Sequence, residues 1–272
     1  ATTTARIGTG IALAFTRSPM IAALESLDLD ELSGGRFILG LGSGVQRLNE
    51  DWHNARFGKA VPHLRETVRN LRTFWRDVAS GTPIELPGEH EPMTLRGYQR
   101  PFRQERPSVP VYLAAMGPAM TRLAGEIADG WISHELYSPR YLSEITMPEL
   151  ERGLVRGARK REDLDVVASV VCAIDADAHT AKRWSAGTVG FYASVRTYAY
   201  FWAFHGLSAE QDRIVQAFRG GLAADDLADI APDHMVAAVT GSGTAKEVRD
   251  RVAAFDGHAD TVKLSPPTHG VG

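Results

Sequence analysis

The stretch that decides the fold is S-G-G-R-F-I-L-G-L-G-S-G, Ser33–Gly44. Its centre, Phe37–Leu41, is a short apolar run with glycines on both sides, which is typical of a strand buried on both faces. Strands of this kind belong to parallel sheets that helices cover. The glycines that follow, Gly42 and Gly44, allow a tight turn or a close approach of the backbone to a ligand. The stretch therefore predicts either a turn after a core strand or a cofactor-facing loop at the carboxyl end of a barrel strand.

The composition is that of an ordinary globular protein. The 272 residues are 44% hydrophobic and 23% charged, with a net charge of -3. This mild acidity argues against a nucleic-acid partner. No apolar run approaches the roughly 20 residues needed to cross a membrane, and the first ten residues lack the pattern of a signal peptide. Because Cys172 is the only cysteine, no intrachain disulfide can form, and we expect a cytoplasmic protein without a membrane partner.

Strands and helices alternate along the chain. We expect six strands, at Arg6–Phe15, Ser33–Gly44, Val109–Ala115, Gly130–Ser133, Leu164–Ile174 and Thr261–Leu264. We expect helices from Pro19 onward and at Leu64–Val78, Ala119–Ala128, Pro139–Arg159 and Thr244–Phe255. This alternation predicts an α/β fold with a parallel sheet and helices outside it.

Two long segments depart from the alternation. Residues 81–107 are rich in proline, glycine and charge, and we interpret them as an excursion with a hairpin through Met93–Leu95. Residues 178–238 are mostly helical, a helical insertion in a single domain spanning residues 1–272. Its aromatic part, Phe191–Phe204, either packs in the core or walls an apolar substrate pocket. The excursion and the loop His134–Pro139 are the expected determinants of substrate choice.

Two architectures fit this order of elements. A doubly wound dinucleotide-binding sheet requires G-x-G-x-x-G after its first strand and an acidic residue about 20 positions further on. The sequence lacks that motif. A TIM-type (β/α)8 barrel remains, although a complete one has eight strands and we count about six.

Three stretches carry a family resemblance. They are T-A-R-I-G-T-G-I-A-L-A-F and its continuation to Trp52, V-P-V-Y-L-A-A-M-G-P-A-M-T-R-L-A-G-E-I-A-D-G-W-I-S-H, and the closing T-G-S-G-T-A-K-E-V-R-D-R-V-A-A-F with D-T-V-K-L. They resemble the bacterial-luciferase-like monooxygenases and coenzyme F420-dependent oxidoreductases, and Phe191–Gly206 is more weakly similar. The Gly241–Thr244 run mimics a phosphate loop, but we interpret it as a helix start.

The resemblance implies a TIM-type barrel that is incomplete at its N-terminus, because the first two strand–helix units of the family pattern are absent. We expect either a fragment or a gap filled by another subunit. The implied function is a flavin- or deazaflavin-dependent oxidoreductase that holds coenzyme F420 or FMN and acts on a small organic molecule. The alternative is a non-catalytic or truncated cofactor-binding relative. We expect a homodimer.

The resemblance also assigns positions around the cofactor ring. The Gly10–Ile11 peptide bond corresponds to a non-proline cis bond that bulges against the ring, whereas an ordinary strand glycine is the alternative. Ser43 and Gly44 correspond to backbone that lies against the ring or its side chain. Some dehydrogenases of the family carry an acid just after this loop, where this sequence has Val45.

A second cofactor position follows the third predicted strand. In the run M-G-P-A-M-T, Met116–Thr121, a strand passes into a helix N-terminus, where free N–H groups and the helix dipole favour an anion. Pro118 has no N–H, so Gly117, Ala119 and Met120 are left as backbone donors. Thr121 adds a hydroxyl if its side chain points to the barrel mouth. The alternative is a capped helix start.

The catalytic residues are unknown from sequence, and His134 is the one candidate. It follows the strand G-W-I-S at the carboxyl end, where barrel chemistry lies. It therefore faces the substrate or acts as a proton donor, or it is a loop histidine exposed to water. Glu50, Asp51 and His53 are of metal-binding types, but they lack a compact ligand spacing. We interpret them as loop surface and expect no metal.

Overall fold

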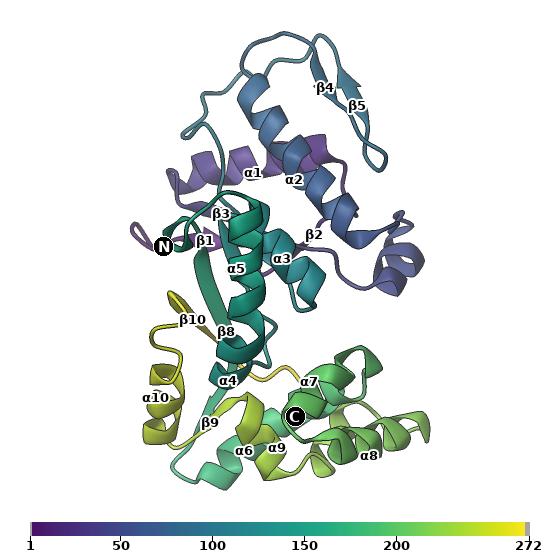
Figure 1. Ribbon diagram of the computed structural model, residues 1–272, viewed down its shortest axis with the longest axis vertical. Helices are drawn as coiled ribbons and strands as arrows, with labels where there is room; N and C mark the ends of the chain where they lie inside the picture. Colours follow the sequence, from purple (N-terminus) through teal and green to yellow (C-terminus); the bar gives the residue numbers. More distant parts are fainter. Residues whose placement is uncertain (1, 270–272) are drawn as a thin grey trace. The chain divides into compact units, whose positions relative to one another are not determined.

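The computed structural model describes residues 2–269. The chain divides into two compact units, the first from residues up to 132 together with 149–165, the second from residues 133–148 and 166 onward (Figure 1). Each unit contains parallel strands and the helices that cover them. The interpretation of residues 1–272 as a single domain stays a prediction.

The sheet of the first unit is parallel, as expected. Its strands are β1 (Ile7–Gly8), β2 (Ala12–Leu13), β3 (Phe37–Gly42), β6 (Val111–Ala114) and β7 (Gly130–Ile132). Both β1 and β2 pair with β3, which pairs with β6, which pairs with β7. The strand predicted at Arg6–Phe15 is therefore two short pieces, and the cis peptide bond Gly10–Ile11 lies between them.

Helices cover this sheet where the apolar pattern predicts them. They are α1 (Pro19–Ser33), α2 (Ala60–Asp77), α3 (Pro118–Ile127) and α5 (Met147–Arg156). The side chain of Ser18 caps α1, and Gly34 ends it in the left-handed conformation at φ 65°. α1 and α2 pack together, and the indole N–H of Trp75 donates to the Ala23 carbonyl oxygen at 3.1 Å.

The predicted excursion contains the expected hairpin. Strands β4 (Ile84–Leu86) and β5 (Met93–Leu95) pair antiparallel. Arg100 ties the end of the excursion to α1, because its buried guanidinium lies 2.8 Å from Asp28 and 2.7 Å from Glu31. The excursion is therefore an ordered part of the first unit.

The second unit has its own parallel strands. From Val166 on, β8 (Asp165–Ile174) pairs in parallel with β10 (Thr261–Ser265) and with β9 (Gly241–Gly243). The Gly241–Thr244 run, which we expected only as a helix start, therefore also forms a short strand. Thr244 then caps α10 (Ala245–Ala253) in a capping box with Glu247.

Residues 178–238 are mostly helical in the structure. They contain α6 (Ala178–Ala193), α7 (Ala199–Phe204), α8 (Ser208–Arg219) and α9 (Asp233–Val239), with short 3-10 turns between them. The helix predicted at Pro139–Arg159 is instead α4 (Pro139–Tyr141), a π-helical stretch at Leu142–Thr146, and α5, which ends at Arg156. An apolar pattern does not distinguish hydrogen bonds to the fourth residue from those to the fifth, so the sequence could not show this stretch.

Three glycines let α3 and α5 approach closely in the first unit. A Cβ atom on Gly153 would lie 2.2 Å from the Arg122 carbonyl oxygen, and one on Gly125 would lie 2.3 Å from the Leu150 carbonyl oxygen. A Cβ on Gly157, just beyond α5, would lie 2.5 Å from the Glu126 carbonyl oxygen. Backbone atoms fill these spaces, so the neighbours cannot move aside as a flexible side chain could.

Helix propensity and packing give opposite predictions for Gly153→Ala. Alanine in place of glycine stabilises a helix interior by about 1 kcal/mol. Overpacking of a filled contact destabilises by about 1–3 kcal/mol. We expect packing to dominate, with a lower free energy of unfolding in urea denaturation. The control is Glu151→Ala, an exposed change in the same helix, which we expect to stay within about 0.5 kcal/mol of the wild type. An unchanged or raised stability of Gly153→Ala would contradict the close contact.

Candidate functional site

The predicted cofactor positions of the first unit lie on neighbouring strand ends. Because β2 pairs with β3 and β3 with β6, the segments that follow these strands are adjacent. The Ile11 side chain reaches the end of β3, where a Cβ on Gly42 would lie 2.9 Å from Ile11 Cδ1 and 3.5 Å from Ala114 Cβ. The structure therefore brings the Ile11, Gly42 and Ala114 positions together, next to Ser43 and the start of α3.

The Gly10–Ile11 bond is cis, as the resemblance implied. It lies within the edge of the sheet, since β2 resumes at Ala12 in register with Leu41. Thr9, just before it, donates its hydroxyl to the Gly40 carbonyl oxygen at 2.7 Å. The backbone of residues 9–11 is thus held directly against β3.

Asn49 holds the glycine loop, and sequence reasoning missed it. It is fully buried in the π-helical turn Leu48–Trp52, and its amide donates to the carbonyl oxygens of Ser43 at 2.8 Å and Val45 at 3.0 Å. Its Oδ1 atom is buried without a partner among the described residues. Gly44 has a φ of 61°, and a Cβ there would lie 2.6 Å from Leu13 Cδ2. The signal available in the sequence was an asparagine a few residues after the glycines, because asparagine side chains often hydrogen-bond to nearby backbone groups.

The N-terminus of α3 has the donors that an anion needs. Gly117 is the N-cap residue, no side-chain hydrogen bond caps the helix, and Pro118 occupies the first turn. A Cβ on Gly117 would meet nothing within 4 Å, and Ala119 beside it is exposed. The first amides of a helix have no partner within it, so those of Ala119 and Met120 are available at this end.

Thr121 lies deeper than these donors. Its side chain is only 2% exposed, and its backbone N–H donates to the Gly117 carbonyl oxygen at 2.9 Å. The backbone amides at the helix start are therefore better placed for an anion than the Thr121 hydroxyl. Its contact with a phosphate stays a prediction.

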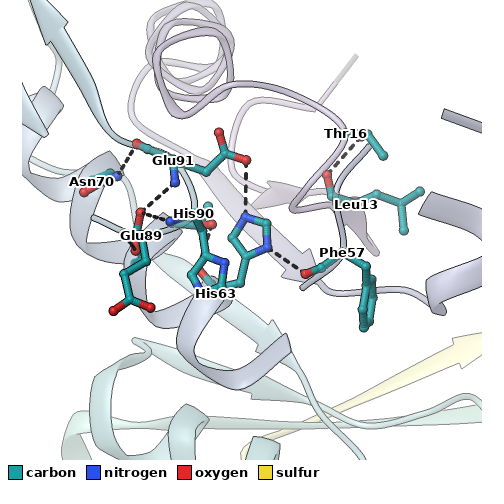
Figure 2. A network of polar contacts seen from close by, with 10 residues as sticks. Leu13, Thr16, Phe57, His63, Asn70, Glu89, His90 and Glu91 are labelled. Atoms are coloured by element: carbon teal, nitrogen blue, oxygen red, sulfur yellow. Dashed lines mark hydrogen bonds and ion pairs between the residues drawn. The ribbon is translucent and has the colours of Figure 1, made fainter. Parts of the chain in front are cut away.

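A buried histidine links the end of β2 to the excursion. Figure 2 shows His63 of α2 between two acceptors. Its Nδ1 atom lies 2.9 Å from the Phe57 carbonyl oxygen and its Nε2 atom lies 3.2 Å from Glu91 Oε1. The ring stacks on Phe15 with centroids 3.8 Å apart and on His90 at 4.5 Å. His63 therefore connects the backbone at Phe57 to Glu91 of the excursion.

Glu66 anchors the same turn of the excursion. Its carboxylate accepts backbone N–H groups from Glu89, His90 and Glu91 at 2.9, 3.0 and 2.7 Å. Burial raises the pKa of Glu66, but these three donors outweigh burial and leave the pKa below its ordinary value. Residues 89–91 of the excursion are therefore held in a turn around the Glu66 carboxylate.

The first unit also contains a cavity of about 440 Å³. It lies between the β2–β3 pair and α1, with Leu13, Leu39 and Ser26 among the residues that line it. None of the predicted cofactor or catalytic residues lines this cavity. The candidate site at the strand ends is thus distinct from it.

His134 lies in the second unit and is not a water-exposed loop residue. Burial lowers the pKa of its ring to about 4, so it is neutral at pH 7. The Leu136 N–H donates to its Nδ1 atom at 3.1 Å, which leaves the proton on Nε2. Its ring packs edge-on against Tyr192 at a centroid distance of 4.3 Å and lies 4.8 Å from Tyr198.

The aromatic segment Phe191–Phe204 contributes to core packing, and its role as the wall of an apolar substrate pocket stays a prediction. Phe201 and Trp202 are at most 1% exposed and belong to the core of the second unit. Tyr192 and Tyr198 instead lie against His134. The segment thus supplies both core packing and the ring cluster around the candidate histidine.

Glu50, Asp51 and His53, the residues of metal-binding types, do not form a metal site. All three are exposed, and Asp51 pairs with Arg47 at 3.4 Å. Within residues 2–269, the structure places no three histidine, cysteine or acidic side chains where they could hold a metal ion. In the same part of the chain, every helix is too short or too polar to cross a membrane.

Comparisons with known proteins agree with this geometry. An uncharacterized protein of Mycobacterium tuberculosis H37Rv is 38% identical over 209 residues, which cover 74% of this chain and 60% of that protein. The chain thus spans about 60% of the length of this relative. The structure of the coenzyme F420-dependent tetrahydromethanopterin reductase from Methanopyrus kandleri superposes with a TM-score of 0.81 at 24% identity, over 96% of this chain and 77% of that one.

A second solved structure has a flavin. The oxygenating constituent of 3,6-diketocamphane monooxygenase from Pseudomonas putida, in complex with FMN, superposes with a TM-score of 0.64 at 16% identity, over 96% of this chain and 72% of that one. Both likenesses show the α/β fold of the TIM-barrel luciferase-like enzymes. The family model for luciferase-like monooxygenases matches residues 1–261. The chain therefore belongs to the luciferase-like monooxygenase family.

Proposed function

We propose that this protein is a flavin- or deazaflavin-dependent oxidoreductase that holds coenzyme F420 or FMN and acts on a small organic molecule. The observation that carries the proposal is the convergence of three segments at neighbouring strand ends. They are the cis Gly10–Ile11 bond, the Ser43–Gly44 loop and the start of α3 at Gly117. The names of the two similar structures support the same two cofactors.

The residues present fit such a group. A planar ring can pack against backbone with small side chains, which Gly10, Ser43 and Gly44 provide, whereas the side chain of Ile11 reaches the end of β3. A phosphate needs donors, and the amides of Ala119 and Met120 at the uncapped start of α3 provide them, because the space beside Gly117 is open. When bound, either cofactor would supply the hydride or oxygen chemistry, and the protein would bind, orient and exclude water.

The protein's own contribution includes His134. With its Nδ1 atom occupied by the Leu136 amide, His134 can donate one hydrogen bond from Nε2 to a substrate oxygen. Because the ring is neutral, it adds no charge that would change which substrates are attracted. We assign it this donor role rather than that of a proton donor at neutral pH.

Gly117→Ala separates cofactor binding from folding. Gly117 has a φ of −83° and open space around its Cβ position, so alanine fits and the free energy of unfolding should change by less than about 0.5 kcal/mol. The new methyl group would occupy the space of the phosphate and weaken one or more hydrogen bonds to it. At about 1.5–3 kcal/mol for each bond to a charged group, we expect the affinity for the bound cofactor to fall about tenfold to a hundredfold.

The measurement is a fluorescence titration of the full chain with FMN and, separately, with coenzyme F420. Pro118→Ala is the matched control, because it adds a backbone donor at the next exposed position and leaves the space beside Gly117 open. We expect its affinity to equal or exceed that of the wild type. An unchanged affinity in Gly117→Ala would place the phosphate elsewhere, and no binding of either cofactor by the wild type would contradict the proposed function.

The buried state of His134 predicts a pH dependence of stability. Its pKa is about 4 in the folded protein, against about 6.5 in an unfolded chain. Below pH 6.5 the unfolded chain binds a proton that the folded protein does not, so the free energy of unfolding falls as the pH drops toward 4. By pH 4.5 this group should cost about 2–3 kcal/mol.

The control is His134→Asn, which keeps a side-chain acceptor for the Leu136 amide but does not titrate. We expect urea denaturation at pH 7 and pH 4.5 to show a larger loss of stability in the wild type than in the variant. His205 also has a pKa lowered to about 4, mainly by burial, but it titrates alike in both proteins. Equal losses in the two proteins would show that His134 is accessible to protons in the folded state.

A further inference from the structure

Two carbonyl groups of the glycine loop turn toward a buried side chain. Asn49 is 0% exposed, and its Nδ2 atom donates to the carbonyl oxygens of Ser43 at 2.8 Å and Val45 at 3.0 Å. A side-chain amide nitrogen carries two N–H donors, so these two bonds use both of them. The side chain therefore holds two alternate peptide groups of the loop at once.

The orientation of the Asn49 amide follows from these neighbours. If its oxygen and nitrogen were exchanged, the oxygen would face two carbonyl oxygens with no hydrogen between them. In the orientation present, Oδ1 is buried without a partner among residues 2–269. A buried polar atom without a partner lowers stability, so packing alone would favour an apolar residue at this position. The two donor bonds are thus the physical reason for an asparagine here.

The same bonds set the direction of two backbone N–H groups. A trans peptide group is planar, and its C=O and N–H point in opposite directions. Because the Ser43 and Val45 carbonyl groups point toward Asn49, the N–H groups of the same peptide groups point away from it. They belong to Gly44 and Gln46, which are exposed, and neither N–H has a hydrogen-bond partner among the described residues. The loop therefore directs two free donors outward.

Asn49 is itself fixed from both sides. Its backbone N–H donates to the Val45 carbonyl oxygen at 3.2 Å, and its carbonyl oxygen accepts from the Ala55 N–H at 2.9 Å. The chain then continues to Phe57, whose carbonyl oxygen lies 2.9 Å from His63 Nδ1. The Asn49 side chain thus has an ordered backbone from which to hold the loop.

The loop lies beside the other proposed cofactor positions of the first unit. A Cβ on Gly42, just before the loop, would lie 2.9 Å from Ile11 Cδ1. A Cβ on Gly44 would lie 2.6 Å from Leu13 Cδ2, at the end of β2. A shift of the loop backbone would therefore change the surface next to residues 10–11.

We propose that Asn49 is a positioning residue for the bound cofactor. It acts through the backbone of residues 43–46, which it keeps in one conformation with the Gly44 and Gln46 N–H groups directed outward. A loop that is ordered before binding loses less conformational entropy when a ligand binds, so the affinity is higher. The step from an ordered loop to cofactor affinity rests on the proposed function.

Asn49→Asp removes the donors and keeps the size of the side chain. A carboxylate oxygen takes the place of Nδ2 and faces two carbonyl oxygens without a hydrogen between them. Asn54→Asp is the matched control, because it makes the same chemical change and adds the same charge at an exposed residue of the same segment. Asn54 has a φ of 50°, a conformation that aspartate also tolerates.

Digestion of the folded protein with trypsin observes the loop without a cofactor. Arg47 follows the glycines and its side chain is 85% exposed, but cleavage after it requires this segment to open locally. We expect cleavage after Arg47 to be about tenfold or more faster in Asn49→Asp, because two hydrogen bonds are lost, and unchanged in Asn54→Asp.

The exposed Arg219 of the second unit is the internal control, and the rate of cleavage after it should stay unchanged in every variant. A variant in which that rate also rises has lost its fold. Asn49→Ala, which removes both bonds without adding a charge, then takes the place of Asn49→Asp, with the same expected result at Arg47.

Cofactor binding separates positioning from a merely structural role. FMN and coenzyme F420 are titrated separately into each full-chain protein, and the absorption spectrum of the ring is recorded at saturation. We expect Asn49→Asp to bind about tenfold or more weakly. Its bound spectrum should approach that of the free cofactor, because the ring loses its fixed neighbour while the start of α3 is unchanged. Asn54→Asp should match the wild type in both measurements.

Two results would overturn the proposal. One is a wild-type rate of cleavage after Arg47 in Asn49→Asp. The other is faster cleavage with unchanged affinity and spectrum, which would leave Asn49 a structural residue only. If neither cofactor binds the wild type, the proposed function fails together with the step to the cofactor, whereas faster cleavage after Arg47 would still show that Asn49 holds the loop.

Discussion

The first unit depends on positions in β3 where no side chain fits. A Cβ atom on Gly40 would lie 2.0 Å from the Thr9 carbonyl oxygen, and the Thr9 hydroxyl bonds to the Gly40 carbonyl oxygen. A Cβ on Gly42 would meet the side chain of Ile11. The absence of side chains lets the backbone around the cis bond lie directly on β3. The neighbouring loops that we propose for the cofactor follow from this contact.

Polar groups behind the strand ends keep these loops in place. Asn49 holds the carbonyl groups of the glycine loop, and His63 joins the Phe57 carbonyl oxygen to Glu91 of the excursion. Glu66 gathers three amides of the same turn. Buried polar networks of this kind specify one arrangement because each lost partner leaves an unsatisfied group in a low-dielectric interior. The excursion thus contributes to the order of the strand ends as well as to the surface.

The second unit places its polar groups differently. Its helical insertion buries Phe201 and Trp202 in a core, while Tyr192 and Tyr198 pack on His134. The hydroxyls of Ser169 in β8 and Ser265 in β10 are buried without a partner among the described residues. Such departures from the apolar pattern are expected at functional positions.

The sequence by itself determined the α/β class, the order of strands and helices, and the family. Apolar runs of period 2 and 3.6, with glycine and proline at their ends, depend on local physics and are readable from neighbours in the chain. The same local signals located the hairpin at Met93–Leu95 and the start of α10 at Thr244.

Only the tertiary structure decided which side chains are buried, paired or left without partners. His63 and Glu66 are ordinary polar residues in the sequence, and their roles arise from contacts with residues 89–91, more than 20 positions away in the chain. The neutral state of His134 likewise follows from burial by rings more than 50 positions away. Burial and electrostatics depend on every group within a few ångströms, and the linear pattern does not record that neighbourhood.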